Sequence, residues 1–540
     1  MVTSSGRPRV RSGTVAGVVL AVALVAARLS AQQHVSPQGA SERLGSVHFA
    51  TSCAPQVAPE FDHAVALLHS FEFGAAIRGF TRVLETDSTC SMARWGIALS
   101  RWGNPMSAGN RSPASLAVGY QAAQAAMRVA LSATDRERGY INAVGQLYAD
   151  YEHANQRTRV VAYQNAMAEL VAKQPADTEA KIFYAIALVA AAPPTDKTYA
   201  NQLEAGALLE QIWARQPNHP GLPHYIIHCY DVPALAGRAR IAAARYADIA
   251  PSAAHALHMP SHTFTRVGMW QESVNTNLRS IEMAKGESAF GEAMHASDYA
   301  EYAYLQMRKD AAAKAIIATL PGLSEKFDPN AIVGAANGAA GNFALAAIPA
   351  RYALERRAWA EAASLVPTAS AFPYTEAMTY FARALGASHT GNLPDARVSI
   401  DSLAAIRERL RAVGEAYWAE QVAIEHLAAR AWLGLAERGD SAAVATMREA
   451  ATREDATEKS AVTPGPLAPA HELLGDMLMQ LGRPQDALGE YRVSLAKEPN
   501  RFRTLYGAMK AAAAVGDKAT EARYAAQLET VTGSAAFSRR

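Results

Sequence analysis

The stretch "HELLGDMLMQLGRPQDALGEYRVSLAKEP", residues 471–499, decides the fold of this 540-residue chain. Apolar residues recur at helical spacing on both sides of Gly482, which predicts two helices joined by a tight turn. Ala487 and Tyr491 are four residues apart, so they share one face of the second helix. The turn glycine returns as Gly516, 34 residues later. The stretch therefore predicts a helix pair that repeats with a period of 34 residues.

The second-helix pattern also recurs upstream, with a small residue followed four places later by a residue of the same face. The copies are Ala76 and Phe80, Ala205 and Leu209, Ala239 and Ala243, and Ala396 and Ile400. The small residue lets two helices approach closely. With Pro499 after the second helix, the pattern resembles that of tetratricopeptide repeat proteins. The resemblance implies an all-α chain, an α-solenoid of tetratricopeptide-like helix pairs forming a superhelix, with a plainer all-α bundle as the alternative.

The composition supports a folded protein and limits its partners. Half of the residues are hydrophobic and 19% are charged, which is enough apolar material for a large core. The 52 basic residues are balanced by 50 acidic ones, without a long basic block. We therefore expect no nucleic acid partner.

The N-terminus predicts export. Three arginines, Arg7, Arg9 and Arg11, precede an apolar run over residues 15–27, and Ala31 offers a cleavage site. The run is shorter than the roughly 20 residues of a membrane-spanning helix, so we expect a cleaved signal peptide rather than an uncleaved anchor. The mature protein is then periplasmic or secreted, with no transmembrane span. The expected organisation is a signal peptide (1–31), a main superhelix (32–452), a charged and Pro-rich loop or linker (453–469) and C-terminal repeats (470–540).

Histidines keep the period of the repeat. His224 and His228 are spaced i, i+4, and adding 34 to each number gives His258 and His262. Each pair lies on one face of the first helix of its repeat. Three further residues, His255, His295 and Asp298, extend these faces to a seven-residue metal set: His224, His228, His255, His258, His262, His295 and Asp298.

Imidazole and carboxylate ligands suit Cu, Zn or Fe. Cys229, Met259 and Met294 are near in sequence, and soft sulfur would favour copper. The alternative is structural, because histidines in stacked repeats can bond one another or backbone carbonyls. Pro260 either kinks the first helix of this repeat or begins a new one.

Further residues of these helices are candidates for ligand binding in the concave groove. They are Tyr225, Asp231, Arg266, Tyr302 and Arg351. A disulfide is predicted between Cys53 and Cys90, which flank the two helices of the front repeat, with two free thiols as the alternative.

Two blocks of the sequence, residues 67–99 and 224–270, resemble blocks found in a group of exported bacterial tetratricopeptide proteins. The chain has no H-E-x-x-H, G-x-S-x-G, G-x-G-x-x-G or P-loop motif, so protease, hydrolase and nucleotide functions lack their usual support. The leading hypothesis is an exported scaffold whose concave groove binds a protein, a peptide or a small ligand. The second is a metalloprotein, which includes a metal-dependent enzyme, centred on the histidines. Elemental analysis of the purified protein separates the two.

Overall fold

Glycines in the left-handed backbone conformation reverse the chain between helices. Gly268, Gly391, Gly482 and Gly516 have φ angles of 69°, 79°, 70° and 77°. A residue with a Cβ is strained there, whereas glycine adopts the conformation freely, which is why it so often follows a helix C-terminus. The four predicted turns therefore join consecutive helices.

The structure is a computed structural model that describes residues 42–107, 109–438 and 441–535, and within these ranges it contains helices and no strand. The first half contains η1 (Pro55–Val57), α1 (Ala58–His69), α2 (Phe73–Thr86), α3 (Ser91–Trp102), α4 (Pro113–Val129), η2 (Ala130–Ser132), α5 (Asp135–Gln146), α6 (Gln156–Lys173), α7 (Thr178–Ala191), α8 (Ala200–Trp213), α9 (Gly221–Cys229), η3 (Ala236–Ala239), α10 (Arg240–Ile249), α11 (Ala254–His258) and α12 (Pro260–Arg266).

The second half continues in the same manner. It contains α13 (Trp270–Gly286), α14 (Phe290–Gln306), α15 (Asp310–Ser324), α16 (Gly338–Glu355), α17 (Trp359–Ser364), α18 (Pro373–Thr390), α19 (Leu393–Ala412), α20 (Ala416–Arg438), α21 (Ser441–Asp455), α22 (Ala470–Gln480), α23 (Pro484–Lys497), α24 (Phe502–Ala514) and α25 (Lys518–Thr532). Helices that follow one another in sequence pack as pairs, as α13 does on α14 and α22 on α23. The all-α fold of stacked helix pairs is confirmed.

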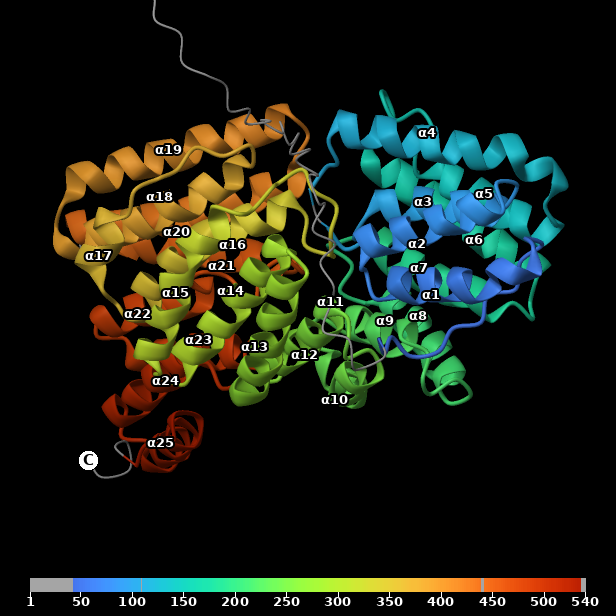
Figure 1. The fold of residues 1–540 in the computed structure, drawn as a ribbon. Helices are drawn as coiled ribbons and strands as arrows, with labels where there is room; N and C mark the ends of the chain where they lie inside the picture. Colours follow the sequence, from blue (N-terminus) through green and yellow to red (C-terminus); the bar gives the residue numbers. More distant parts are fainter. Residues whose placement is uncertain (1–41, 108, 439–440, 536–540) are drawn as a thin grey trace, which may run out of the picture. The chain divides into compact units, whose positions relative to one another are not determined.

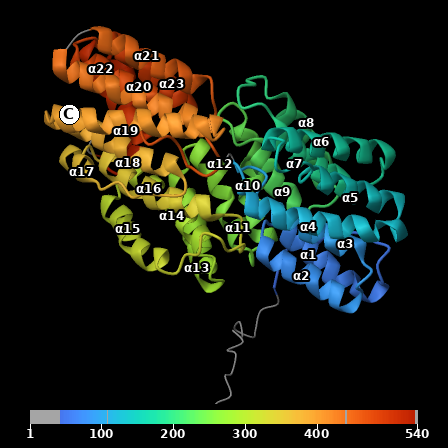
Figure 2. The same cartoon turned by 90° about the horizontal axis from the view of Figure 1, so that it is seen from above.

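Residues 43–540 form one compact unit with two large hydrophobic cores. The first core extends from Leu44 to Met259, with Ala335 added, and the second extends from Phe343 to Leu528. Small clusters built from α11 and α13–α16 lie between them. Figures 1 and 2 show α9–α12 between the N-terminal helices and the helices of the second half.

Other predictions concern the chain ends and connections. Cys53 and Cys90 form a disulfide, with their Cα atoms 4.9 Å apart. The predicted signal peptide lies outside the described residues. None of the described helices is both long and apolar enough to cross a membrane. The expected loop is shorter than predicted, because α21 continues to Asp455 and the non-helical segment spans residues 456–469.

Candidate metal centre

Four helices, α9, α11, α12 and α14, bring six histidines together. His224 and His228 lie on α9, His255 and His258 on α11, His262 on α12 and His295 on α14. They form two groups of three, His224–His228–His255 and His258–His262–His295, and within each group one nitrogen per ring lies within 4.8 Å of the others. The groups adjoin each other, because the His255 and His258 ring centres are 5.9 Å apart and those of His228 and His262 are 6.0 Å apart. The period of 34 residues thus produces two neighbouring three-histidine sets.

The backbone around Pro260 allows both i, i+4 rings of the second repeat to face the same side. Pro260 is the first residue of α12, where its missing N–H costs nothing. Met259 has helical dihedral angles, φ −53° and ψ −35°, so α11 and α12 follow one another across a single residue. Of the two alternatives for Pro260, the structure therefore shows the start of a new helix.

The first group is held by partners on its outer ring nitrogens. His224 Nδ1 donates to the backbone carbonyl of His69 at 2.6 Å, and His255 Nδ1 donates to Glu292 Oε1 at 2.9 Å. The inner nitrogens converge, with His224 Nε2 and His228 Nε2 at 3.2 Å. His255 Nε2 is buried and has no partner among the described residues.

The second group repeats this arrangement. His258 Nδ1 donates to Asn277 Oδ1 at 2.7 Å, and His262 Nδ1 donates to Asp231 Oδ2 at 2.9 Å. The two Nε2 atoms face each other at 3.1 Å. His295 interacts with the backbone of Val462, while its Nδ1 has no partner in the described part of the chain.

These outer contacts determine where each ring carries its proton. A neutral imidazole has one N–H and one lone pair. The Asn277 side chain donates through Nδ2 to the Ser273 carbonyl, so its oxygen faces His258 and requires an N–H at Nδ1. The Asp231 carboxylate requires the same of His262. Each Nε2 atom then carries a lone pair. The two Nε2 atoms are 3.1 Å apart, and their lone pairs repel each other unless a cation lies between them.

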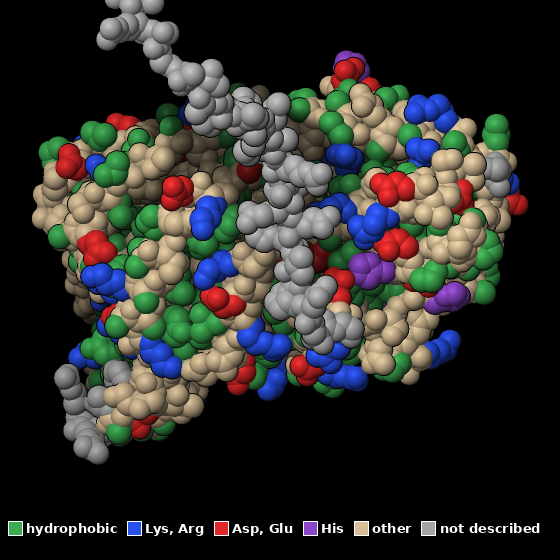
Figure 3. Space-filling model, viewed as in Figure 1, with side chains coloured by type: hydrophobic (Ala, Val, Ile, Leu, Met, Phe, Trp, Pro, Cys, Tyr) green, Lys and Arg blue, Asp and Glu red, His purple; other side chains and the backbone are tan. Residues whose placement is uncertain are grey.

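Burial keeps the rings neutral. All six side chains are buried, and His224 and His258 are completely enclosed. Burial, followed by the repulsion of neighbouring imidazoles, lowers the pKa of His224, His228, His258 and His295 well below the usual range. On the face shown in Figure 3, histidines are few, and Lys and Arg side chains are interspersed with Asp and Glu.

The centre opens on a large cavity. Its volume is about 710 Å³, and its lining includes two histidines of each group, His228 and His255 from the first and His262 and His295 from the second. The stacked rings of Tyr374 and Trp418, with centres 3.9 Å apart, form part of another wall. Both three-histidine groups are therefore accessible from the same cavity.

The 456–469 segment covers the centre as a strap. Tyr299 Oη lies 3.0 Å from the carbonyls of Ala461 and Thr463, and Lys459 Nζ lies 3.2 Å from Asp231 Oδ2. Asp231 also accepts from Arg266 Nε at 2.9 Å through its other oxygen. The predicted linker thus encloses the site, which corrects our expectation that the histidines face an open concave groove.

Phe71 covers the first group from the opposite side. Its ring centre is 4.3 Å from that of His224 and 5.6 Å from that of His255. Phe71 has φ 57°, a left-handed conformation that a residue with a Cβ adopts at a cost of about 1–3 kcal/mol. The turn between α1 and α2 therefore holds an aromatic ring against the histidines in a strained conformation.

Sequence reasoning missed several supporting residues. Glu292 precedes His295 by three residues and shares its helical face, a signal that was available. Asn277, Phe71 and the strap come from other helices or distant segments, and the repeat pattern contains no signal for them.

Among the other predicted site residues, Asp231 alone has a described contact with a nitrogen of the six histidines, at His262 Nδ1. Asp298 is paired with Arg351, 3.3 Å between Oδ1 and Nε, and belongs to neither three-histidine group. Tyr302 contacts Arg501 at 2.9 Å, and Tyr225 contacts His69 at 3.1 Å. Of the five residues predicted to bind a ligand, namely Tyr225, Asp231, Arg266, Tyr302 and Arg351, none lines the histidine cavity. Asp231 and Arg266 instead support His262.

The sulfur atoms expected near the centre do not join it. Cys229 is buried in the first core and contributes to none of the candidate ligand groups of the described residues. Met259 and Met294 are buried in hydrophobic clusters. A preference for copper therefore cannot rest on sulfur.

A third histidine group differs from these two. His69 Nε2 and His219 Nε2 each lie 3.0 Å from one oxygen of Glu179. His219 Nδ1 accepts from the Gly221 N–H, and His69 Nδ1 lies 3.1 Å from the Tyr225 hydroxyl. Every ring nitrogen of this group has a complementary partner. A Cβ at Gly221 would lie 2.6 Å from His69 Nδ1, so glycine is required for α9 to approach it.

Comparisons with known proteins leave the family of this chain open. No protein family and no curated protein matches the sequence. Among solved structures, the crystal structure of yeast Tom70 matches with a TM-score of 0.30 and 10% identity, covering 85% of this chain and 89% of that one. A structure of Naa15/Naa10 bound to HypK-THB matches with a TM-score of 0.20 and 11% identity, covering 88% and 68%. Likenesses this low say nothing about function, and membership in the exported bacterial group stays a prediction.

Proposed function

We propose that the protein is a metalloprotein with a binuclear centre, in which each ion is held by three imidazoles. The observation that carries this proposal is the distance of 3.1 Å between His258 Nε2 and His262 Nε2. Because the Nδ1 atoms of these rings donate to Asn277 and Asp231, each Nε2 atom carries a lone pair and no proton. Buried polar atoms are normally satisfied, and a cation satisfies both lone pairs at once. The partnerless nitrogens of His255 and His295 supply the third ligands of the two groups.

The outer partners match those of a metal site. Ligating histidines usually donate their other N–H to a carboxylate, an amide or a carbonyl, which orients the ring and raises its basicity. Glu292, Asp231, Asn277 and the His69 carbonyl play these parts for four of the six rings. Such partners hold the site in shape before metal binds.

Copper fits the ligand set best. Imidazole suits Cu, Zn and Fe alike. Two adjacent divalent ions without an anionic ligand repel strongly in a buried site, and the repulsion between two monovalent ions is about one quarter as large. Copper is the one of the three metals that binds as a monovalent ion. Zinc or iron is the alternative outcome of metal analysis.

The cavity supports a role in chemistry on a small molecule. A volume of about 710 Å³ accommodates an organic substrate beside both groups. Two copper ions held by the two three-imidazole groups would relay two electrons from a substrate to dioxygen, so that a substrate losing two electrons and two protons would be oxidised while dioxygen became hydrogen peroxide. The chain's own residues orient the ligands through Asp231 and Glu292, and the strap covers one side of the centre.

The predicted scaffold function and the predicted export stay proposals beside this one. The Cys53–Cys90 disulfide is compatible with an oxidising compartment. Stacked helix pairs are an architecture that binds partners, but fold alone is a weak basis for function. The six-histidine centre is the feature with specific chemistry.

The test is metal stoichiometry on the purified full chain. The metal-free protein is titrated with Cu(I) under anaerobic conditions, and with Zn(II) separately, and bound metal is measured by mass spectrometry after gel filtration. We expect two ions per chain in the wild type and none in the double variant His228→Ala, His262→Ala, because one ligand is removed from each group.

The matched control is His153→Ala, which removes an exposed histidine outside the site and should retain two ions. Circular dichroism verifies that all three proteins keep their helices. Wild-type protein that binds no metal, or a double variant that binds as much as the wild type, would overturn the proposal.

A further inference from the structure

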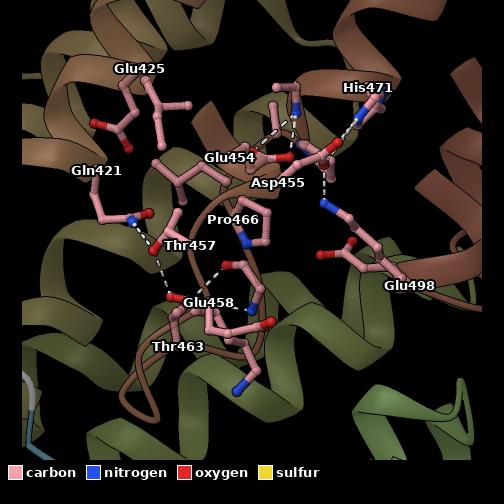
Figure 4. Close-up of a pocket in the computed structure, with 18 of the residues that line it drawn as sticks. Gln421, Glu425, Glu454, Asp455, Thr457, Glu458, Thr463, Pro466, His471 and Glu498 are labelled. Atoms are coloured by element: carbon pink, nitrogen blue, oxygen red, sulfur yellow. Dashed lines mark hydrogen bonds and ion pairs between the residues drawn. The ribbon is translucent and has the colours of Figure 1, made fainter. Parts of the chain in front are cut away.

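A second cavity is also lined by strap residues and by Tyr374 and Trp418, but its other lining residues have a different character. Its volume is about 480 Å³, and it is lined by parts of α16, α18 and α20 and by the strap itself. Figure 4 shows this cavity with Glu425 and Gln421 on one side and with Glu454, Asp455 and Glu498 on the other. No histidine of the candidate metal centre lines it.

One wall of this cavity is aromatic. Tyr374 and Trp418 stack with an interplanar angle of 9°, and Phe381 and Tyr417 extend the apolar surface. Trp418 and Glu425 are seven residues apart on α20, so both lie on the same face of that helix. A carboxylate is thus placed beside aromatic faces, which attract cations through their negative π surface.

Every cation that lines the cavity already has an acidic partner. Lys197 pairs with Glu458 at 2.7 Å, and Lys459 and Arg266 both pair with Asp231. The remaining lining cations do the same, with Lys497 bound to Asp455 and His471 bound to Glu490 and Asp455. The basic groups of this cavity are therefore neutralised.

Two of the acids have no cationic partner within ion-pair distance. Glu454 accepts only the backbone N–H of Ala470, at 3.0 Å. Glu425 has no ion pair or hydrogen bond among the described residues, and no dashed line reaches it in Figure 4. Burial raises the pKa of Glu425 to about 8 and that of Glu454 to about 7. The cavity thus holds two buried carboxyl groups without an ion-pair partner, and a bound cation would favour their ionised form.

We infer that this cavity binds an organic cation, with its ammonium group at Glu425, its apolar body against Tyr374 and Trp418, and Glu454 adding negative charge from the facing wall. Charge complementarity determines the sign of the ligand, and the aromatic wall determines its apolar part. This inference does not depend on metal binding at the histidines, because the two cavities have separate ligating groups.

Isothermal titration calorimetry of the full chain at pH 8 tests the inference with two probes of the same shape. 2-Phenylethylammonium carries the charge and 2-phenylethanol does not. We expect the wild type to bind the ammonium probe about tenfold more tightly than the alcohol, the equivalent of one partly screened charge pair. Glu425→Gln should abolish the preference, because the amide keeps the shape and loses the charge.

Glu449→Gln is the matched control, since Glu449 is exposed on the same helix as Glu454 and lines neither cavity. It should keep the tenfold preference. Glu454→Gln, which should reduce the preference, is the second variant if Glu425→Gln fails to fold. Binding of neither probe, equal binding of both by the wild type, or a preference that survives both cavity variants would overturn the inference.

Discussion

Two buried histidine clusters adjoin each other, and they satisfy their ring nitrogens in different ways. In the His69–Glu179–His219 cluster, a carboxylate accepts from both rings, and the two remaining nitrogens have a hydroxyl and a backbone N–H as partners. In the six-histidine cluster, four outer nitrogens have acceptors, while inner nitrogens face each other or have no hydrogen-bond partner in the described part of the chain. His69 connects the two clusters, because its ring belongs to the first cluster and its backbone carbonyl accepts from His224 of the second.

The difference shows how a structural histidine is distinguished from a ligand. Both clusters are buried, and both bring three ligand atoms within 4.8 Å, so proximity alone ranks them equally. The two clusters differ in whether each ring nitrogen has a hydrogen-bond partner of the complementary kind. A matched cluster stabilises the fold by itself, whereas an unmatched one gains stability when a cation compensates its lone pairs.

The largest expected effect concerns the matched cluster. Glu179→Ala leaves two buried N–H groups without an acceptor, so we expect the free energy of unfolding of the metal-free protein to fall by about 3–5 kcal/mol. Urea unfolding followed by circular dichroism measures this loss. Metal content per folded chain should stay at two ions. A variant as stable as the wild type would mean that the matched cluster contributes nothing to stability.

Metal addition should stabilise the protein through the unmatched cluster. At a free metal concentration ten times the dissociation constant, each site adds about 1.4 kcal/mol to the free energy of unfolding, because only the folded chain presents three ligands together. Urea unfolding with and without Cu(I) measures the shift. The double variant His228→Ala, His262→Ala should show none, and a shift that persists in it would place the metal elsewhere.

The same substitution in each cluster sharpens the contrast. His219→Gln breaks a matched set and should cost about 1–3 kcal/mol in the metal-free protein. His228→Gln places an amide N–H near the His224 lone pair, so its cost should stay below about 1 kcal/mol while one metal site is lost. Unfolding curves and metal analysis of the two variants decide this together. Equal losses of stability would remove the distinction between the clusters.

The smallest effect is a pH dependence in the matched cluster. Burial alone would raise the pKa of Glu179, but the neighbouring His219 and His69 outweigh it, and the pKa lies below the usual range. The carboxylate therefore stabilises the fold above the unfolded pKa of about 4.5, and this contribution decreases as the pH falls below it. The stability gap between wild type and Glu179→Ala should narrow by about 1.4 kcal/mol between pH 7 and pH 3.5. Unfolding at both pH values measures the gap, and a constant gap would show that the pKa of Glu179 is the same in the folded and the unfolded protein.

Much of the architecture could be predicted from local patterns. The turn glycines and the period of 34 residues depend on contacts within one or two repeats, which is why Gly268 and Gly482 were found from sequence alone. The same period located His224, His228, His258 and His262, because residues one repeat apart lie side by side in stacked helices.

The remainder of the site depends on contacts between distant segments. Asn277 reaches His258 from the facing helix α13, and Asp298 turns to Arg351 on α16 instead of the histidines. A repeat pattern describes neighbours within the solenoid and does not contain such pairings. The strap is the extreme case, since its Pro-rich sequence predicts only a loop.

Because the strap lies late in the chain, the histidine site can assemble before the strap closes it. The carbonyl of Ala461 that bonds Tyr299 lies 162 residues further along the chain. During N-to-C synthesis, all six histidines and their outer partners on α13 and α14 are complete before the strap residues are added. An ion that arrives in that interval meets an open site. After the strap has bonded Tyr299 and Asp231, an ion bound as proposed would exchange more slowly, because that side of the site opens only when the segment detaches. Two proteins with the same six ligands, one with this segment in place and one without it, would hold metal equally tightly at equilibrium and yet exchange it on different timescales.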